Sequence, residues 1–398
     1  MKAYIRTFQF VFNIGARFLK WKRPEIIKGE GALKNVPEIL LKEGKKKPLI
    51  VCGPHIRLSL VPELLSYLDE KKISYEIYKD VEADPKSSTA EKIKELYLCK
   101  KCDSFILFGG GSPMDAGKAA ASLIACPKKK VKDLQGLLKV NGKLPLMIAV
   151  PTTAGTGSET TIAAVITDDS TGRKKAIMDL RIVPSYAVLD PGLTIGLSPK
   201  TTAETGMDAL THAVEAYICW TYNTEESLRE AEDAVKLIFE NLEKAYLNGT
   251  DISARENMLQ ASLKAGFAFT RAGVGYVHAI AHTLGGLYHI PHGRANAVLL
   301  PVVLRDYGKA VYPKLSRLAE ITGISGNTEE ERALNFISHI EEMGKRMNIP
   351  ECFSEIDERD YDTICTWALK EANPVYPVPV IYDRNRIVSI LEKVRKKG

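Results

Sequence analysis

The arrangement of apolar residues along the chain limits the possible folds most strongly. This arrangement changes near residue 195, which indicates two regions of different secondary structure. Before that point, runs rich in branched apolar residues alternate with helical patterns such as SSTAEKIKELYL; the runs lie at 47–53, 73–78, 103–111, 144–151 and 187–192. This alternation is typical of a parallel sheet whose strands are connected by helices. After that point, apolar residues recur at intervals of three and four, as in EESLREAEDAVKLIFENLEKAY. We therefore predict an α/β domain over 1–194 and an all-α domain over 195–398.

The composition excludes several classes of protein. The chain has 398 residues, of which 45% are hydrophobic and 26% are charged, so it can bury a large core. Its 55 Lys and Arg exceed its 49 Asp and Glu by a formal charge of +6, spread in short runs such as 45–47. That excess is too diffuse to predict binding to nucleic acid. No apolar run approaches the ~18 residues of a membrane span, so we expect no membrane-spanning segment.

The seven cysteines favour a reducing compartment. Their number is odd and they are scattered singly, apart from Cys99 and Cys102 in CKKC, so we expect reduced thiols and a cytoplasmic protein. The CKKC pair has no second CxxC partner and closes a charged helical stretch. We therefore favour a structural role for it over a zinc or redox motif.

The N-terminal segment YIRTFQFVFNIGARFLKWKR mixes aromatic and basic residues. Such a mixture suits an anionic membrane surface or a secretory signal. However, Asn13 and Arg17 interrupt the apolar part, and no small-residue cleavage site follows. We favour a segment that packs on the body of the protein or on a partner subunit.

Two turns in the first half carry small residues that suit a nucleotide. In SFILFGGGSPMDAGKAAA an apolar strand ends at three glycines, and a helix is predicted to begin with Ser112 as N-cap and Pro113 as its first residue. Bare backbone N–H groups at the positive end of a helix bind a pyrophosphate. In PTTAGTGSETT a second strand is followed by small residues and hydroxyls. Either turn alone could be structural, but two such turns at strand ends of one sheet favour a nucleotide.

The stretch HAIAHTLGGLYHIPHG contains four of the seven histidines of the chain. His278 and His282 are four residues apart on a predicted helix and share one face. Upstream, GMDALTHAVEAY places Asp208 and His212 at the same spacing, and His292 follows a Gly-Gly turn and a proline. Two helices that present ligands at this spacing can close a site for a borderline divalent cation.

Four segments, GGGSPMDAGKA, PTTAGTGSETT, GMDALTHAVEAY and HAIAHTLGGLYHIPHGRANAVLLP, resemble the successive signatures of the iron-containing (group III) alcohol dehydrogenases. The resemblance runs from IIKGEGALKNVPEIL to NPVYPVP and covers nearly the whole chain. It implies a Rossmann-like dinucleotide-binding α/β domain and a helical domain, in the dehydroquinate synthase-like architecture, with the metal in the cleft between them. We also expect a homo-oligomer, specifically a dimer.

Carried over by position, the resemblance implies roles for individual residues. The implied metal ligands are Asp208, His212, His278 and His292. His282 falls beside the nicotinamide as a catalytic proton-relay group, and His289 matches no functional position. The implied cofactor-binding residues are Gly110, Gly111, Ser112, Asp115, Thr152, Thr153, Ser158 and the ribose-contacting Lys174. A set of three histidines and one aspartate accepts Fe²⁺ or Zn²⁺, and the resemblance favours Fe²⁺.

The implied reaction is hydride transfer between a metal-bound alkoxide and C4 of the nicotinamide, with a small alcohol or aldehyde as substrate. Two alternatives remain open. One is another enzyme on the same architecture, either a polyol dehydrogenase or a metal-dependent carbon–oxygen lyase. The other is a dinucleotide-binding redox sensor without turnover, against which the complete ligand set argues.

The stretch LIVCGPHIRLS bears on the choice of nicotinamide cofactor. Dinucleotide-binding folds that prefer NAD(H) place a carboxylate near the ribose 2′-OH, where it would repel a 2′-phosphate. This sequence has Gly53 after the first strand, followed by His55 and Arg57 as possible phosphate donors. We expect NADP(H) to be preferred over NAD(H), although a glycine that merely permits a tight turn would allow both.

Overall fold

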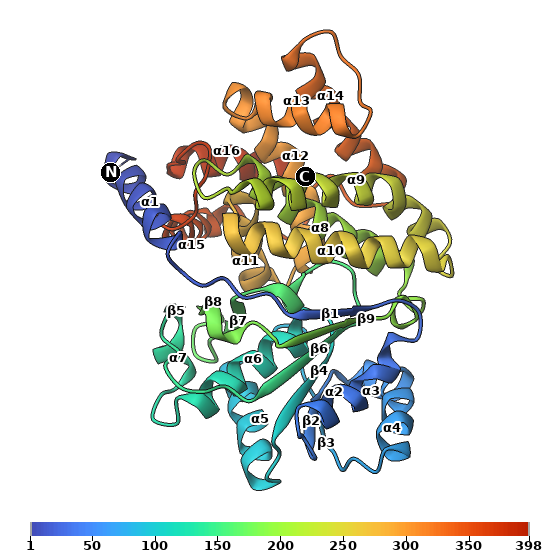
Figure 1. Cartoon of the computed structure of the whole chain (residues 1–398). Coiled ribbons are helices and arrows are strands. Elements are labelled where there is room, and N and C mark those ends of the chain that lie inside the picture. The colour runs from blue at the N-terminus through green and yellow to red at the C-terminus, as the bar shows by residue number, and fades with distance from the viewer. Residues whose placement is uncertain (1, 397–398) are drawn as a thin grey trace. The chain divides into compact units, whose positions relative to one another are not determined.

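The computed structural model describes residues 2–396, except for the side chain of Arg57, and divides into two compact units (Figure 1). One unit is residues 20–196. The other is formed by residues 2–19 together with 197–396. The change of sequence pattern at 194–195 therefore lies close to the break between the units, but the N-terminal segment groups with the helical part of the chain.

The α/β unit is built on a six-stranded sheet with the strand order β1-β9-β6-β4-β2-β3. Every neighbouring pair is parallel. The strands are β1 (Glu25–Lys28), β2 (Pro48–Val51), β3 (Glu76–Tyr78), β4 (Ser104–Gly109), β6 (Leu146–Pro151) and β9 (Tyr186–Leu189). The helices of this unit are α2 (Val36–Lys42), α3 (Pro54–Ser59), α4 (Val61–Glu70), α5 (Ser87–Cys99), α6 (Gly111–Ala125) and α7 (Val131–Leu134). The predicted parallel α/β fold is confirmed.

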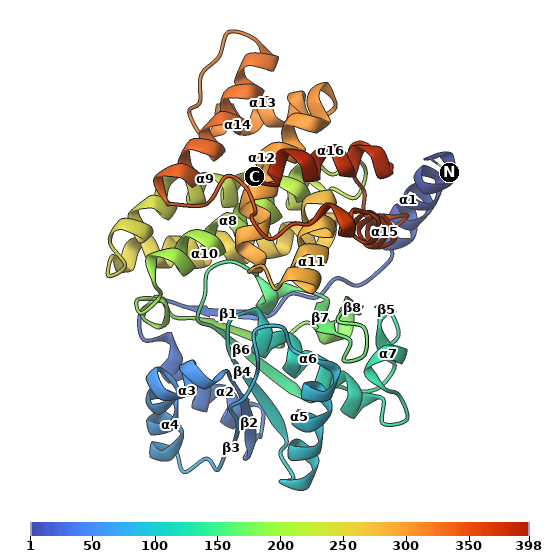
Figure 2. The ribbon, with the colours of Figure 1, turned by 180° about the vertical axis from the view of Figure 1, so that it is seen from behind.

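The central strands β2, β4 and β6 are apolar apart from Ser104 and Gly109 of β4, as expected for strands whose sheet is covered on both faces. Ile50 and Ile106 belong to a core cluster with residues of α2 and α4, whereas their neighbours Leu49 and Phe105 pack with residues of α5 and α6. Successive side chains of a strand point to opposite faces, so the two clusters are the two faces of one sheet. Figure 2 shows α5 and α6 on the side of the sheet opposite α2 and α4.

A second, three-stranded sheet lies in the same unit and escapes prediction from the sequence. Its order is β5-β8-β7, with β5 (Gly136–Leu137), β7 (Ala163–Thr167) and β8 (Lys174–Met178), and β7 and β8 are antiparallel. β8 begins with Lys174 and Lys175, and β7, although apolar over 163–166, is only half-buried at alternate positions, so neither is fully buried like the central strands.

The helical unit contains no β-strand among the described residues 197–396, which confirms the predicted all-α character. Its helices are α8 (Pro199–Ile218), α9 (Glu225–Leu247), α10 (Ile252–Ala272), α11 (Tyr276–Tyr288), α12 (His292–Tyr307), α13 (Tyr312–Ile321), α14 (Glu329–Arg346), α15 (Tyr361–Ala372) and α16 (Arg384–Val394). Side-chain oxygens cap several of them; Ser198, for example, accepts from the Thr201 amide at the start of α8. Within the described residues, we find no helix that is both long and apolar enough to cross a membrane.

The N-terminal helix α1 (Lys2–Ala16) packs on the helical unit at its periphery, beside α15 (Figures 1 and 2). Arg6 donates to the carbonyls of Val378 and Pro379, each at 2.8 Å, and the amide of Gln9 donates to the Tyr376 carbonyl at 2.6 Å. These bonds explain why residues 2–19 belong to the helical unit. This arrangement also agrees with the expectation that the segment packs on the body of the protein.

Candidate metal centre and cofactor edge

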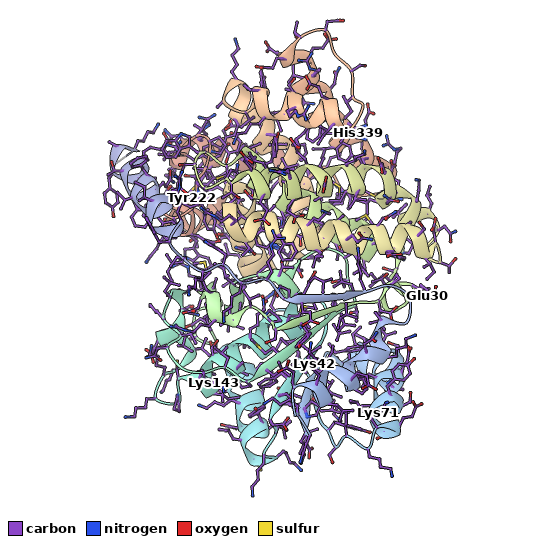
Figure 3. All side chains as sticks on the ribbon, viewed as in Figure 1. Glu30, Lys42, Lys71, Lys143, Tyr222 and His339 are labelled. Carbon is purple, nitrogen blue, oxygen red and sulfur yellow. The ribbon has the colours of Figure 1, made fainter. Side chains whose placement is uncertain are left out.

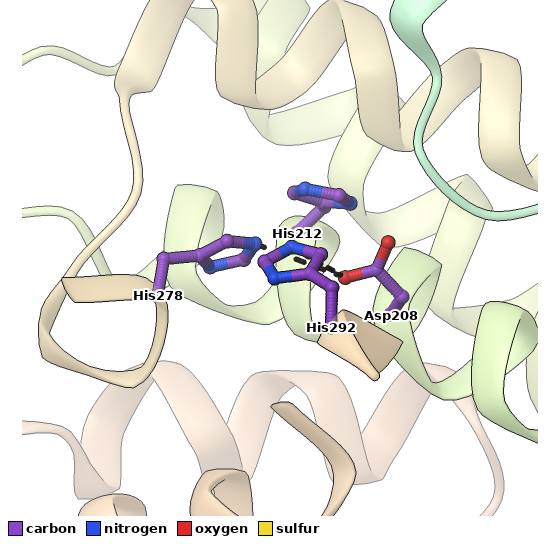
Figure 4. A group of neighbouring side chains, drawn as sticks. All are labelled: Asp208, His212, His278 and His292. Carbon is purple, nitrogen blue, oxygen red and sulfur yellow. Dashed lines mark ion pairs between the residues drawn. The ribbon is translucent and has the colours of Figure 1, made fainter. Parts of the chain in front are cut away.

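Four polar side chains of the helical unit meet at one point (Figure 4). Asp208 and His212 lie one turn apart on α8, His278 lies in the first turn of α11, and His292 is the first residue of α12. Each offers one ligand atom, and these atoms all lie within 4.8 Å of one another. The structure therefore brings together all four ligands that the sequence resemblance implied.

The geometry of this cluster fits a divalent cation. In a tetrahedron with bonds of about 2.1 Å, neighbouring ligand atoms are about 3.4 Å apart. Oδ1 of Asp208 lies 3.4 Å from Nε2 of His292 and 3.9 Å from Nε2 of His278. Burial lowers the pKa of His278 to about 3, so its imidazole is neutral and has a lone pair for a cation. The side chain of His292 is 29% exposed, so the cluster is open on that side.

Glu215 fixes the orientation of His278 and is a residue that the sequence reasoning missed. Its carboxylate accepts from Nδ1 of His278 at 2.6 Å and from the amides of Gly275 and Val277, each at 2.9 Å. Because Nδ1 is occupied, Nε2 of His278 faces the cluster. Burial raises the pKa of Glu215 to about 7, although the hydrogen bonds that it accepts oppose this rise. Its place on α8, a helical turn beyond His212, is the signal that could have found it.

Asn296 is a second scaffolding residue that was missed. It is fully buried one turn after His292 on α12, and its Nδ2 donates to Oδ1 of Asp208 at 2.7 Å. The same nitrogen lies 3.2 Å from Nε2 of His278 and 3.1 Å from Nε2 of His292. The spacing of four from His292 could have suggested that it faces the cluster.

His282 lies beside the cluster but is held by different residues. Its ring centroid is 5.0 Å from that of His292, and its Nδ1 lies 2.6 Å from Oε1 of Glu371. The Tyr376 hydroxyl donates to the same carboxylate oxygen at 2.8 Å. His282 does not belong to the group of converging ligand atoms, as the sequence resemblance implied. By contrast, His289 is exposed and caps the end of α11 with a left-handed φ of 55°.

In the α/β unit, the glycine and threonine candidates lie at one edge of the main sheet. Strands β2, β4 and β6 are adjacent and parallel, so their carboxyl ends meet at the same edge. Gly53 follows β2, Gly110 and Gly111 follow β4, and Thr152 follows β6. The strand order reverses between β2 and β4, since β3 lies on the other side of β2. Ligands of open α/β sheets bind at such a reversal.

The two turns at this edge are in close contact. A Cβ at Gly110 would lie 3.1 Å from Oγ1 of Thr153, and one at Gly111 would lie 2.9 Å from the Thr156 side chain. Gly109 has a φ of +150°, and its Cβ would lie 2.7 Å from the Pro113 ring. Glycine is therefore needed at this turn for both conformation and space.

The predicted capping of α6 is wrong in one respect. Its N-cap is Gly110, not Ser112, and Gly111 already belongs to the helix. The Ser112 hydroxyl instead donates to the carbonyl of Ala83. The cause is that the helix begins two residues earlier than expected, directly after the turn at Gly109 and Gly110, so no side chain occupies the cap position. The N-terminal amides of this helix are thus open to an anionic ligand.

Asp115 and Ser158 hold the threonine-rich turn in place. Asp115 accepts from the Ser158 hydroxyl at 2.8 Å and from the Val165 amide at 3.0 Å. Lys118, which was not singled out in the sequence, is completely buried. Its Nζ donates to the carbonyl and hydroxyl oxygens of Ser158 and Thr161 and to the Ala163 carbonyl. A buried ammonium satisfied by such acceptors fixes the backbone around it.

The remaining cofactor candidates are placed as follows. The hydroxyl of Thr152 is buried and has no hydrogen-bond partner in the described part of the chain, as expected of a group that awaits a ligand. Lys174 begins β8, and its Nζ pairs with Asp84 at 2.5 Å. His55 is exposed on α3, and the side chain of Arg57 lies outside the described residues.

A parallel sheet with a glycine-lined edge, together with a buried cluster of one aspartate and three histidines, defines a nucleotide-binding fold that carries a candidate metal centre. Comparison with known proteins is consistent with both parts. Residues 24–191 match the family described as iron-containing alcohol dehydrogenase, and residues 202–395 match the C-terminal part of the Fe-containing alcohol dehydrogenase family.

Individual relatives cover most of the chain. The 1,3-propanediol dehydrogenase of Klebsiella pneumoniae is 39% identical over 87% of this chain and 90% of its own length. The NADPH-dependent butanol dehydrogenase of Clostridium saccharobutylicum is 37% identical over 85% and 87%, respectively. The NAD-dependent methanol dehydrogenase of Bacillus methanolicus is 36% identical over 85% and 89%. A crystal structure of a 1,3-propanediol oxidoreductase superposes with a TM-score of 0.91 at 36% identity, covering 95% of this chain and 100% of that one. The chain therefore belongs to the iron-containing alcohol dehydrogenase family.

Proposed function

We propose that this chain is a metal-dependent, NAD(P)-linked alcohol dehydrogenase and aldehyde reductase that acts on a small alcohol or aldehyde and prefers NADP(H). The observation that carries the proposal is the convergence of four ligand atoms within 4.8 Å. Glu215 and Asn296 support it, since both hold candidate ligands in place through buried hydrogen bonds.

In this proposal Asp208, His212, His278 and His292 hold a divalent cation, with Fe²⁺ favoured by family membership and Zn²⁺ chemically acceptable. When bound, such a cation stabilises negative charge on an alcohol oxygen and polarises an aldehyde carbonyl. The partly exposed His292 side marks the direction from which a substrate reaches the cluster. The three buried ligands exclude water from the other sides.

The proton of the alcohol is assigned to His282. Glu371 accepts from Nδ1 of this histidine, so Nε2 is the atom left to take up or release a proton. The side chain of His282 is 16% exposed and that of Glu371 is 22% exposed, so both can exchange protons with solvent. The Tyr376 hydroxyl fixes the Glu371 carboxylate. His282 therefore acts in catalysis without holding the metal.

The preference for NADP(H) rests on Gly53. Gly53, the second residue after β2, has no side chain at the position where a carboxylate would repel a 2′-phosphate. The relatives include both an NADPH-dependent and an NAD-dependent enzyme, so the family alone does not decide the cofactor. We further propose that the implied residues Gly110, Gly111, Ser112, Asp115, Thr152, Thr153, Ser158 and Lys174 bind or position the cofactor.

The reaction is tested with metal-defined protein against a panel of small alcohols and aldehydes, with NADPH and NADH in parallel. A dehydrogenase consumes one cofactor per substrate, whereas a lyase turns over without net consumption. Turnover that leaves the nicotinamide unchanged would contradict the proposal. Light scattering on the same preparation tests the expected homodimer.

The cofactor preference is tested by comparing kcat/KM for NADPH and NADH, which we expect to favour NADPH. Gly53→Asp should shift the ratio toward NADH by about tenfold, through repulsion of the phosphate. The substitution fits, because φ is −86° and a Cβ would meet only the Val81 carbonyl, at 3.4 Å. Gly53→Asn has nearly the same shape without the charge and should shift the ratio much less. An equal or higher kcat/KM with NADH in the unmodified protein refutes the preference.

A further inference from the structure

Helix α1 exposes several large apolar residues, and half of the residues that it buries are polar, unlike an ordinary amphipathic surface helix. Its buried residues are Ile5, Gln9, Asn13 and Ala16. Two of these four are amides, and both make hydrogen bonds: Gln9 to the Tyr376 carbonyl, and Asn13 to Thr221 at 3.3 Å. The contact with the helical unit therefore combines apolar packing with specific hydrogen bonds.

The opposite side of α1 forms an apolar face, which we define as Tyr4, Phe10, Val11, Ile14 and Phe18. Their exposed fractions are 65%, 57%, 61%, 45% and 84%, respectively. At 100° per residue, the four that lie in α1 fall within about a third of the helix circumference, and Phe18 lies in the turn directly after it. Scattered exposed apolar residues are ordinary, but a continuous exposed face marks a surface that interacts with something.

The helix is held firmly enough to present this face. Arg6 binds two carbonyls of the segment after α15, and its guanidinium lies 4.5 Å from the centre of the Trp220 ring. Phe12 packs on Tyr222, labelled in Figure 3, with ring centroids 5.3 Å apart. Trp220 is itself 44% exposed and adds an aromatic ring beside the helix. Tryptophan and other aromatic side chains are favoured at the boundary between water and lipid.

The charge of the segment decides which partner the apolar face suits. The first acidic residue of the chain is Glu25, whereas six basic residues precede it: Lys2, Arg6, Arg17, Lys20, Lys22 and Arg23. Lys2 and Arg17 are exposed on the described helix and its end. A second copy of this segment would bring like charges together, which opposes association. An anionic lipid surface attracts them.

We propose that α1 docks this protein on an anionic membrane surface, with the apolar face inserted among the lipid headgroups and the basic residues beside the phosphates. This places the protein on the membrane rather than across it. The residues that match the family begin at 24, so α1 lies outside the matched residues. The proposal is independent of the proposed enzymatic function.

The test is co-sedimentation of the full-length protein with vesicles. One set contains phosphatidylcholine alone, and the other contains phosphatidylserine as about a third of the lipid. We expect binding to the anionic vesicles that weakens as salt is added, and little binding to the neutral ones. The triple variant Phe10→Gln, Val11→Gln, Phe18→Gln should reduce the partition coefficient by at least about tenfold. Arg17→Gln alone should reduce it by about fivefold.

The matched control is Leu247→Gln, which removes an apolar side chain that is 80% exposed at the end of α9 in the same unit. It should bind vesicles like the unmodified protein. Equal binding of the unmodified protein to both vesicle types, or to neither, overturns the proposal. So does a triple variant that keeps its vesicle binding. If the triple variant instead has a smaller mass by light scattering, α1 covers a second copy of the chain and the membrane proposal is wrong.

Discussion

The candidate metal centre and the cofactor edge are built from different parts of the polypeptide. The metal centre consists of side chains: imidazoles and a carboxylate converge from α8, α11 and α12. The cofactor edge consists largely of main chain, since Gly110 and Gly111 offer amides and leave no room for a side chain. A side-chain site tolerates backbone changes that keep the ligands in place. A main-chain site depends on the exact path of two turns.

Each region also contains a buried glutamate, and burial raises the pKa of each to about 7. The two differ in the interactions that oppose this rise. Glu215 of the helical unit accepts three hydrogen bonds, from the Gly275 and Val277 amides and the His278 ring. For Glu159 of the α/β unit, the rise in pKa is opposed mainly by a hydrogen bond from its own backbone amide and by the positive charge of Lys118. Direct hydrogen bonds thus hold Glu215 in the helical unit, whereas in the α/β unit the charge of Lys118 is part of what opposes the rise in the pKa of Glu159.

Loss of one ligand should break the metal centre completely. We expect His278→Ala to lose its metal and to reduce kcat/KM by at least about a thousandfold, because the buried cluster then lacks one of its four donors. Elemental analysis and steady-state rates measure both effects. The matched control is His289→Asn, at the exposed end of the same helix, which should keep metal and rate. Full activity in His278→Ala would refute the ligand assignment.

The α/β unit should carry its largest pH effect at Glu159. An unfolded glutamate loses its proton near pH 4.5, whereas folded Glu159 keeps its proton up to about 7. The folded state binds more protons between these values, so its free energy of unfolding falls as the pH rises through this range. Glu159→Gln should remove up to about 3 kcal/mol of this loss at pH 8 and change little near pH 4. Urea unfolding between pH 4 and pH 8 measures the free energy of unfolding of the unmodified protein and of the variant. If the two free energies change with pH in parallel, the raised pKa is wrongly assigned to Glu159.

Substitution of His282 should impair catalysis without impairing metal binding. We expect His282→Ala to retain its metal but to lose about a hundredfold in kcat, because a proton-transfer group is removed while the ligand cluster remains. Metal content and kcat are measured on the same preparation. A loss of metal equal to that of His278→Ala would show that the two roles are assigned wrongly.

The scaffold of the metal centre should give the smallest effect. Glu215→Gln places an amide NH₂ against one of its donors, so we expect metal affinity to fall by about 10- to 100-fold while the fold is retained. Competition with a chelator measures the affinity. The control, Glu225→Gln, alters a carboxylate that is 89% exposed on α9 and should leave the affinity unchanged.

The sequence indicated the four residues of the candidate metal centre more directly than it indicated the cofactor edge. Histidine and aspartate side chains carry the chemistry themselves, and a helix puts Asp208 and His212, four residues apart, on one face. The same spacing pairs His278 with His282, which lies outside the cluster, so the choice of His292 came from the family resemblance. The position of the cofactor edge depends on which strands are neighbours in the sheet. No local sequence pattern specifies the reversal of strand order between β2 and β4. The sequence placed the glycine turn correctly but misplaced the cap by two residues, because capping depends on where the chain turns.

Scaffolding residues were missed in both regions. Glu215 and Asn296 are marked only by their helical spacing from His212 and His292, and no pattern marks Lys118, because a polar letter on a helix does not itself show whether the side chain is buried. The antiparallel pair β7 and β8 was missed because β8 begins with two lysines, so that only β7 carries an apolar run. Burial, which depends on contacts between distant segments, is what separates these residues from ordinary surface ones.

The enclosed amine of Lys118 offers a way to time the motion of the turn that it holds. Its Nζ is surrounded by oxygens of Ser158, Thr161 and Ala163, so an acylating reagent reaches it only when that segment opens. The rate at which Lys118 is labelled then reports how often the segment opens. A dinucleotide seated against the turn should slow the labelling in proportion to its occupancy.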